Sequence, residues 1–275
     1  MKTGHSHPLI ALLTDFGLRD NFSGVMKGVI LRDCPTATFV DITHSVPPQS
    51  ILHASLCLRG AYLYFPSETI FVAVVDPGVG TSRGIIAVSG HAMTFVAPDN
   101  GLLWPLVEAM PGSEMWEITW RPECKVGATF HGRDIFAPVA AKLASGAALS
   151  DIGEQVETIK RFEIPSPVCE DWEIGGEVIY IDNFGNLTTN VSRSLLEEKF
   201  SREYLEALCV KIGTEEICGL PGTYAEVPVG DAAMVFNSFD MLEIAVNCGN
   251  AARRFDAVMG TKIFVSLNNR SESCE

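Results

Sequence analysis

The sequence predicts an α/β domain followed by a smaller β-rich domain. In the first part of the chain, apolar runs of strand length alternate with segments that carry apolar residues at helical spacing. Such alternation is typical of a mostly parallel sheet sandwiched by helices. Further on, short strand-like segments at turn-rich spacing dominate, which predicts an antiparallel, barrel-like sheet. We expect an N-terminal α/β domain over residues 1–164, a linker over 165–172 that contains Pro165 and Pro167, and a C-terminal domain over 173–275.

The expected elements follow in chain order. In the first domain, the pattern predicts strands at 9–14, 38–42, 69–75, 85–89, 94–97 and 115–118, and helices at 23–32, 50–64, 102–110 and 135–144. In the second domain, it predicts strands at 176–181, 187–191, 209–212, 233–236, 242–245 and 262–265, with helices at 192–200 and 249–255.

Composition narrows the class of protein. The chain has 275 residues, of which 47% are hydrophobic, and a formal net charge of −14. An acidic chain is a poor partner for nucleic acid or an anionic membrane surface, and it is compatible with a cationic small-molecule substrate. No apolar run is long enough for a membrane span or a signal segment, and we expect a cytoplasmic protein. The eight cysteines form no C-x-x-C pair, which favours reduced thiols and disfavours zinc.

Three carboxylates stand where predicted strands end. Asp15, Asp76 and Asp99 each follow an apolar strand-like run, and Asp76 opens the loop Asp76-Pro77-Gly78-Val79-Gly80. Ligands of open α/β sheets bind at the carboxyl ends of the strands, so these acids indicate a site. A bidentate carboxylate at Asp15 suits the hydroxyl pair of a ribose.

A cation and an imidazole complete the candidate site. Arg83 lies seven residues after Asp76, and His131 stands in the turn before the Ala-rich helix. If Asp76, Arg83 and His131 meet, they can bind a water and bias it toward hydroxide. A helix-capping or core role is the commoner fate of a lone histidine. His44, at the end of the second strand, is expected to play a supporting role at most.

The glycines of the loop do not indicate a dinucleotide site. Gly78, Gly80 and Gly84 are followed by a strand-like segment, so no helix N-terminus meets a phosphate. In the second domain, the turns at Asp182-Asn183-Phe184-Gly185-Asn186, at Asn237-Ser238 and around Cys248 also fit ordinary hairpin chemistry.

Taken together, the motifs resemble those of the S-adenosyl-L-methionine hydroxide adenosyltransferase family, relatives of the fluorinating and chlorinating enzymes. The resemblance extends over nearly the whole chain. It rests on Thr14-Asp15-Phe16-Gly17, Asp41-Ile42-Thr43-His44, Val75-Asp76-Pro77-Gly78-Val79-Gly80, Pro98-Asp99-Asn100-Gly101, Phe130-His131-Gly132-Arg133-Asp134, Asp182-Asn183-Phe184-Gly185-Asn186 and Asn237-Ser238.

This resemblance implies roles for individual residues. Asp76, Arg83 and His131 match the triad that activates water. The implied substrate-binding residues are Asp15 for the ribose diol, Asp182 for the methionine ammonium, Asn186 and Cys248 for the adenine, Ser238 for the methionine end, and Phe130 as a wall of the site. The resemblance also implies a homotrimer with sites at the subunit interfaces, and no cofactor or metal.

Two positions depart from the family pattern. Asp240 stands where a glycine is usual, and Cys248 stands at the edge of the expected adenine site. The halogenating relatives lack the charged triad, so this chain resembles the hydroxide users.

The implied reaction is hydrolysis of S-adenosyl-L-methionine to adenosine and L-methionine, by attack of activated water at ribose C5′. Two alternatives stay open. One is a metal-dependent hydrolase of a nucleotide-like substrate, with Asp15, Asp76, Asp99 and His131 as ligands. The other is a non-catalytic binder of S-adenosylmethionine or a nucleoside.

Overall fold

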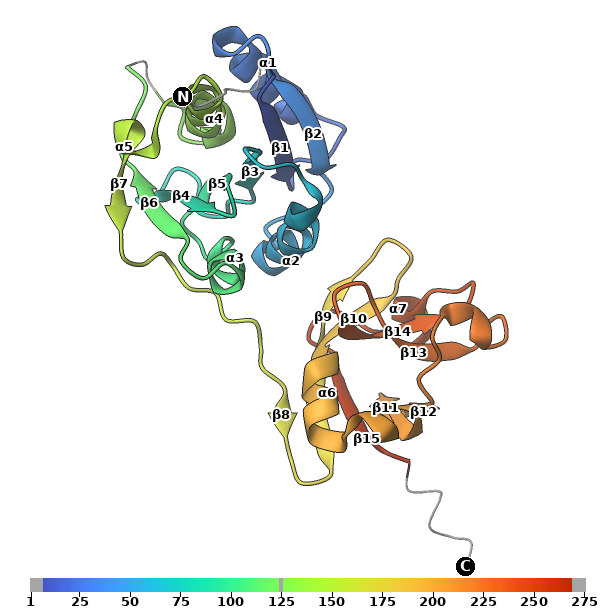
Figure 1. The fold of residues 1–275 in the computed structure, drawn as a ribbon. Helices are drawn as coiled ribbons and strands as arrows, with labels where there is room; N and C mark the ends of the chain where they lie inside the picture. Colours follow the sequence, from blue (N-terminus) through green and yellow to red (C-terminus); the bar gives the residue numbers. More distant parts are fainter. Residues whose placement is uncertain (1–6, 124–125, 269–275) are drawn as a thin grey trace, which may run out of the picture. The chain divides into compact units, whose positions relative to one another are not determined.

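The computed structural model describes residues 7–123 and 126–268. The chain folds into two compact units, Met1–Phe162 and Glu163–Glu275 (Figure 1).

The first unit is built on a seven-stranded sheet with the order β2-β1-β3-β5-β4-β6-β7. Its strands are β1 (Leu9–Thr14), β2 (Thr38–Thr43), β3 (Ile70–Val74), β4 (Ile85–Gly90), β5 (Met93–Pro98), β6 (Glu114–Ile118) and β7 (Gly153–Val156). The pairs β1–β2, β1–β3 and β3–β5 are parallel, while β4, β6 and β7 extend the sheet in antiparallel fashion. The carboxyl ends of β1, β3 and β5 therefore share one edge of the sheet.

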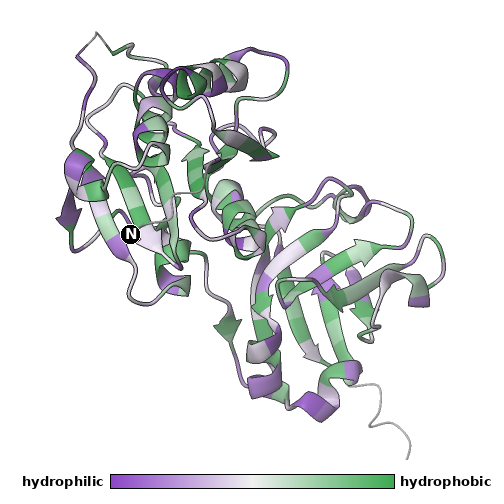
Figure 2. Ribbon diagram, turned by 45° about the horizontal axis from the view of Figure 1, so that its top comes forward, coloured by the Kyte–Doolittle hydropathy of each residue, from purple (hydrophilic) through white to green (hydrophobic). Residues whose placement is uncertain are grey.

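Helices cover both faces of this sheet because its central strands are apolar on both sides. They are α1 (Phe22–Asp33), α2 (Ile51–Ala61), α3 (Trp104–Ala109), α4 (Ala137–Ala144) and α5 (Leu149–Ile152). Along β1, Ala11 and Leu13 join the core under α2 and α3, while Ile10 and Leu12 join the core under α1 and α4. Figure 2 shows the result as apolar central strands between helices that carry polar residues on part of their surface.

The second unit is an antiparallel sheet with the order β12-β11-β15-β9-β10-β14-β13, which nearly closes into a barrel. Its elements are β8 (Val168–Cys169), β9 (Glu173–Ile181), β10 (Leu187–Ser192), α6 (Arg193–Phe200), β11 (Leu208–Ile212), β12 (Glu215–Cys218), β13 (Ala232–Phe236), β14 (Met241–Val246), α7 (Ala251–Arg254) and β15 (Lys262–Leu267). Alternate residues of the strands enclose a single core with α6.

The predicted fold class is confirmed for both units. The structure adds β7, β8 and β12, which are too short or too polar to stand out by periodicity, and β8 pairs with β9 from within the segment predicted as linker. The predicted helix at 135–144 begins earlier, with a π-helical turn, η2 (Gly132–Phe136). Three 3₁₀ turns complete the described elements: η1 (Tyr62–Tyr64), η3 (Arg202–Ala207) and η4 (Tyr224–Glu226).

One expectation about the cysteines is wrong. Cys209 and Cys218 face each other across β11 and β12 and form a disulfide, whereas we expected reduced thiols. The polar segment Glu215–Cys218 was not predicted as a strand, so sequence reasoning did not bring the two residues together. Cys34, Cys169 and Cys248 are free thiols. Cys124 and Cys274 lie outside the described residues.

Among the described residues, no helix combines the length and the apolar character that a membrane crossing requires.

Candidate active site

Asp76 and Arg83 form a nearly buried ion pair at the end of β3. The Asp76 side chain is 6% exposed and that of Arg83 is 10% exposed. Arg83 Nε donates to both carboxylate oxygens at 2.9 Å, and Nη2 makes a further short contact with Oδ2. The guanidinium also lies 5.5 Å from the ring centroid of Phe136 in η2. A bidentate pair of this kind fixes the direction of the remaining guanidinium N–H groups.

His131 joins this pair from the turn before η2. Its Nδ1 lies 2.9 Å from Arg83 Nη2. Because a guanidinium only donates hydrogen bonds, Nδ1 accepts, and the neutral ring carries its hydrogen on Nε2. Burial and the charge of Arg83 lower the pKa of His131 below its usual range, against the raising effect of Asp76. The three residues that we predicted to meet are therefore in contact, and the imidazole is neutral at neutral pH.

The loop between Asp76 and Arg83 needs a glycine at one point. Gly80 has a φ of +79°, and a Cβ there would lie 2.4 Å from the backbone oxygen of Ala128. The close approach brings the loop against the segment that leads into His131, so Gly80 helps to hold the two halves of the triad together.

A cluster of aromatic rings connects the loop of Asp15 to Phe130. Asp15 follows β1, and its Oδ2 accepts a hydrogen bond from the backbone N–H of Gln49 at 2.8 Å. The next residue, Phe16, packs edge-on against Phe130 at 6.0 Å between centroids, and Phe22 contacts both rings. This cluster connects the Asp15 loop to the turn that carries His131.

His44 and Asp99 support the loops of this edge. The buried His44 ring places Nδ1 2.8 Å from Thr14 Oγ1, and Nε2 lies 3.1 Å from Asp41 Oδ1. The His44 carbonyl accepts from Gly17 N at 2.7 Å, so His44 holds both ends of the Asp15 loop. Asp99 Oδ1 instead accepts from Lys160 N at 2.7 Å and ties down a distant segment.

In the second unit, Asp182 and Asn186 form one turn between β9 and β10. Asp182 Oδ1 accepts from the backbone N–H groups of Phe184 and Asn186, and Oδ2 accepts from Asn186 Nδ2 at 3.0 Å. Gly185 has a φ of +88° and lies so close to Asn250 that a Cβ would be 2.2 Å from that side chain. The turn therefore packs against the segment that follows Cys248, and the two predicted adenine contacts come from neighbouring turns.

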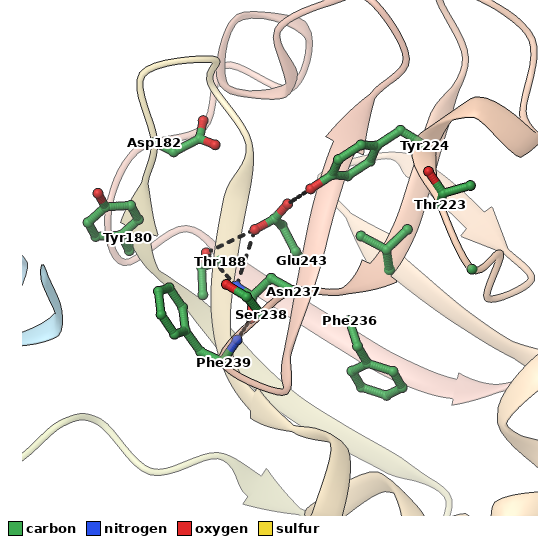
Figure 3. A pocket seen from close by; sticks show the side chains of 12 residues that line it. Tyr180, Asp182, Thr188, Thr223, Tyr224, Phe236, Asn237, Ser238, Phe239 and Glu243 are labelled. Atoms are coloured by element: carbon green, nitrogen blue, oxygen red, sulfur yellow. Dashed lines mark hydrogen bonds between the residues drawn. The ribbon is translucent and has the colours of Figure 1, made fainter. Parts of the chain in front are cut away.

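Asp182 and Ser238 line one cavity of about 460 Å³ (Figure 3). Tyr224 and Glu243, which the sequence analysis did not select, line it as well. Glu243 lies in the middle of an apolar strand, and its polar character at a buried position was the signal that could have found it.

Both departures from the family pattern lie at residues with a left-handed backbone. Asp240 has a φ of +55° and Cys248 a φ of +54°, the left-handed region that favours glycine. Asp240 accepts a hydrogen bond from Arg193 N at 2.8 Å with its carbonyl, and its carboxylate pairs with Arg193 Nε at 3.1 Å. These contacts hold the turn that follows Ser238 without a glycine.

The residues of the metal alternative do not converge. In the described ranges, the only group of three or more His, Cys, Asp or Glu ligand atoms within 4.8 Å of one another is Cys209, Glu216 and Cys218. The two sulfurs of that group are joined in the disulfide. Asp76, the central acid of the alternative, is paired with Arg83 instead.

The fold and the charged triad define a two-domain α/β-plus-β protein with an acid, a guanidinium and an imidazole at the edge of its parallel strands. Residues 10–153 match the SAM hydroxide adenosyltransferase N-terminal domain, and residues 176–264 match the C-terminal domain of that family. The chain belongs to the SAM hydroxide adenosyltransferase family.

Individual relatives agree with this assignment. The chain is 36% identical to the (R)-S-adenosyl-L-methionine hydrolase of Salinispora arenicola, over 95% of this chain and 98% of that protein. It is 28% identical to the fluorinase of an Actinoplanes species, over 95% of this chain and 98% of the fluorinase. A crystal structure of an uncharacterised conserved protein from Thermotoga maritima superimposes with a TM-score of 0.86 at 38% identity, covering 94% and 99% of the two chains.

We predict that Gly80→Ala lowers turnover by displacing the loop from Ala128. The matched control is Gly112→Ala, because Gly112 has a φ of +82° but open space around its Cα. Both variants should lose about 1–2 kcal/mol of stability from the left-handed backbone. Only Gly80→Ala should also lose activity, because only its new methyl group meets the backbone of Ala128. Urea denaturation and initial rates measure the two effects, and equal activities of the two variants would contradict the prediction.

Proposed function

We propose that the protein is an (R)-S-adenosyl-L-methionine hydrolase that forms adenosine and L-methionine. The single observation that carries the proposal is the contact of Arg83 with both Asp76 and His131 in a chain of this family. The halogenating relatives lack such a charged triad, and the hydrolase of Salinispora arenicola is among the similar proteins.

The proposed chemistry needs an activated nucleophile and no acid for the leaving group. A water oxygen forms the new bond to ribose C5′ as the C5′–S bond breaks, and the electron pair of that bond goes to the sulfonium sulfur. The leaving group is then a neutral thioether. Positioning of the water in line with C5′–S is the larger contribution, at up to about 7–11 kcal/mol.

The geometry of the triad suggests separate tasks for its members. Since Nδ1 of His131 accepts from Arg83, its Nε2–H is a donor that can hold the water oxygen. Asp76 Oδ1 accepts a hydrogen bond from Arg83 Nε and keeps a lone pair for the water proton. Asp76 is thus the proposed base, Arg83 stabilises its charge and that of the forming hydroxide, and His131 orients the water.

The proposed substrate contacts follow the resemblance. Asp15 would bind the ribose diol, Asp182 the methionine ammonium and Ser238 the methionine end, with Asn186 and Cys248 at the adenine and Phe130 as a wall. The shared cavity of Asp182 and Ser238 supports the assignment of these two residues to one end of the substrate.

A homotrimer with active sites at the subunit interfaces forms part of the proposal. Large apolar side chains are exposed beside the candidate site residues: Leu18 after Asp15, Phe184 between Asp182 and Asn186, and Phe239 after Ser238. In each unit, these side chains offer apolar surface next to the site residues that another chain can cover.

Incubation with S-adenosylmethionine in ¹⁸O water tests the reaction. We expect adenosine labelled in the 5′-hydroxyl, in equal amount to L-methionine, and undiminished by EDTA. Label elsewhere, or loss of product with EDTA, would contradict the water-attack mechanism. Stoichiometric binding without product would favour the non-catalytic alternative.

Asp76→Asn should lower kcat by about 10²–10⁴-fold with a much smaller change in substrate binding, because the proposed base is lost. His131→Asn should cost less, since only the water orientation suffers. Equal losses of kcat and of affinity in both variants would mean that these residues only shape the site.

The activity should depend on pH through His131. Nδ1 accepts from Arg83 only while the ring is neutral, and the pKa of His131 is lowered. Turnover should therefore be constant through neutral pH and fall only below about pH 6.5, the ordinary histidine pKa. In Arg83→Gln, the guanidinium that lowers this pKa is absent, so any residual activity should fall at a higher pH. An unchanged midpoint in this variant would contradict the assignment.

Light scattering checks the oligomer. We expect a particle of three times the 29.8 kDa chain mass, and this mass should stay the same when the protein is diluted. A monomer that retains full activity would contradict sites shared between subunits.

A further inference from the structure

Glu243 is a buried carboxylate with no cationic partner in the part of the chain that the structure describes. It lies in β14, is 6% exposed and lines the cavity of Asp182 and Ser238. Its hydrogen-bond partners are Tyr224, Thr188 and Asn237, all of them neutral donors (Figure 3). Burying a carboxylate is costly, and an apolar residue would serve the core of the sheet better. This cost points to a function for the group.

The hydrogen bonds of Glu243 form a network with two arms, one through Asn237 and one through Tyr224. The first arm fixes the turn that carries Ser238. Asn237 Nδ2 donates to Glu243 Oε2 at 3.2 Å and to Thr188 Oγ1 at 3.1 Å. Because a carboxylate only accepts, the amide of Asn237 has one orientation, with Oδ1 on the opposite side. Oδ1 accepts from the backbone N–H groups of Phe239 and Met241 at 3.0 and 3.2 Å. Glu243 thereby sets the conformation on both sides of Ser238.

The second arm fixes the opposite wall of the cavity. Tyr224 Oη donates to Glu243 Oε1 in a short contact. Burial raises the pKa of Tyr224, and Glu243 and Asp182 raise it further, so the phenol stays a donor at physiological pH. Tyr224 belongs to the three-residue turn η4, none of whose residues is buried. The contact with Glu243 therefore holds the ring against the cavity.

The charged side chains that line the cavity are all acidic. Asp182 and Glu243 line it, and none of its described lining residues is Lys, Arg or His. Two carboxylates in a half-enclosed cavity favour a cation such as an ammonium group.

We propose that Glu243 is a positioning residue for the amino-acid end of the substrate. It holds Asn237, which precedes Ser238, and Tyr224, which lines the same cavity as Asp182, so that the cavity keeps the shape that takes an α-ammonium group. The charge of Glu243 adds to the attraction for that group. The inference rests on the proposed function and extends it, because it assigns substrate affinity to a residue that does not perform the chemistry.

The test uses the full-length chain and three variants. Glu243→Gln removes the charge and places an NH₂ group against one of the donors, and Tyr224→Phe removes one arm while keeping the ring. Glu215→Gln is the matched control, since the side chain of Glu215 in β12 is 43% exposed, pairs with Arg254 and does not line the cavity. Steady-state kinetics give kcat and KM for S-adenosylmethionine, and L-methionine serves as a second probe by product inhibition and by its shift of the melting temperature.

Glu243→Gln should raise KM and the L-methionine inhibition constant about tenfold or more, with kcat within about threefold of the parent. Tyr224→Phe should show a smaller rise, and the double variant should lose less than the product of the two effects, because both act through one network. Glu215→Gln should match the parent.

Unchanged KM and methionine affinity in Glu243→Gln, or a loss confined to kcat, would overturn the proposal. If Glu243→Gln does not fold, Tyr224→Phe alone decides between these outcomes. If the parent forms no adenosine, the proposed function fails. The role of Glu243 is then tested separately, by comparing the shift of the melting temperature with L-methionine in the parent and in Glu243→Gln. Absence of that shift in the parent would overturn the proposal as well.

Discussion

The architecture of the candidate site depends on the pairing of one guanidinium with two acceptors. Arg83 uses Nε and Nη2 on Asp76, and Nη2 also reaches His131. A buried carboxylate and a buried guanidinium would each be costly alone, so each stabilises the ionised form of the other. The same pair determines the chemistry at His131, because a donor at Nδ1 leaves the ring neutral and its Nε2–H free to donate. Loop conformation, tautomer and charge therefore follow from one interaction.

Local sequence explains why these groups meet. The parallel strands β1 and β3 end at one edge, so the acids that follow them lie on neighbouring loops. Gly80 lets the loop after β3 approach Ala128, and the aromatic contact of Phe16 with Phe130 joins the loop after β1 to the same region. The site is thus built from three loops whose close approach depends on one glycine and one pair of rings.

Sequence reasoning succeeded where the signal was periodic and failed where it was not. The strands and helices of the first unit are long and apolar, so their positions and the fold class could be predicted. Glu215–Cys218 is a short, polar edge strand without such a pattern, and the disulfide with Cys209 was missed for that reason. The place of Asp76 could be expected from its strand end, and its meeting with Arg83 and His131 from the family resemblance, but the tautomer of His131 required the position of Arg83. Glu243 and Tyr224 were missed because a single polar residue in a strand does not reveal its partners.

The charged side chains of the two units suit ligand groups of opposite charge. In the first unit, the loops at the carboxyl ends of the parallel strands hold the nearly buried Arg83, whose charge favours a hydroxide-like nucleophile in the proposed reaction. In the second unit, a cavity carries two carboxylates and suits a cationic group. Each of these two features suits S-adenosylmethionine, the proposed substrate: it carries an ammonium group and a sulfonium, and the nucleophile that attacks it gains negative charge. Once the C5′–S bond breaks, the sulfonium becomes a neutral thioether, and methionine retains only its ammonium as a cation. If the cavity of the second unit takes the ammonium end, as proposed, its electrostatic attraction is weaker for methionine than for S-adenosylmethionine, and product release needs no change in the protein.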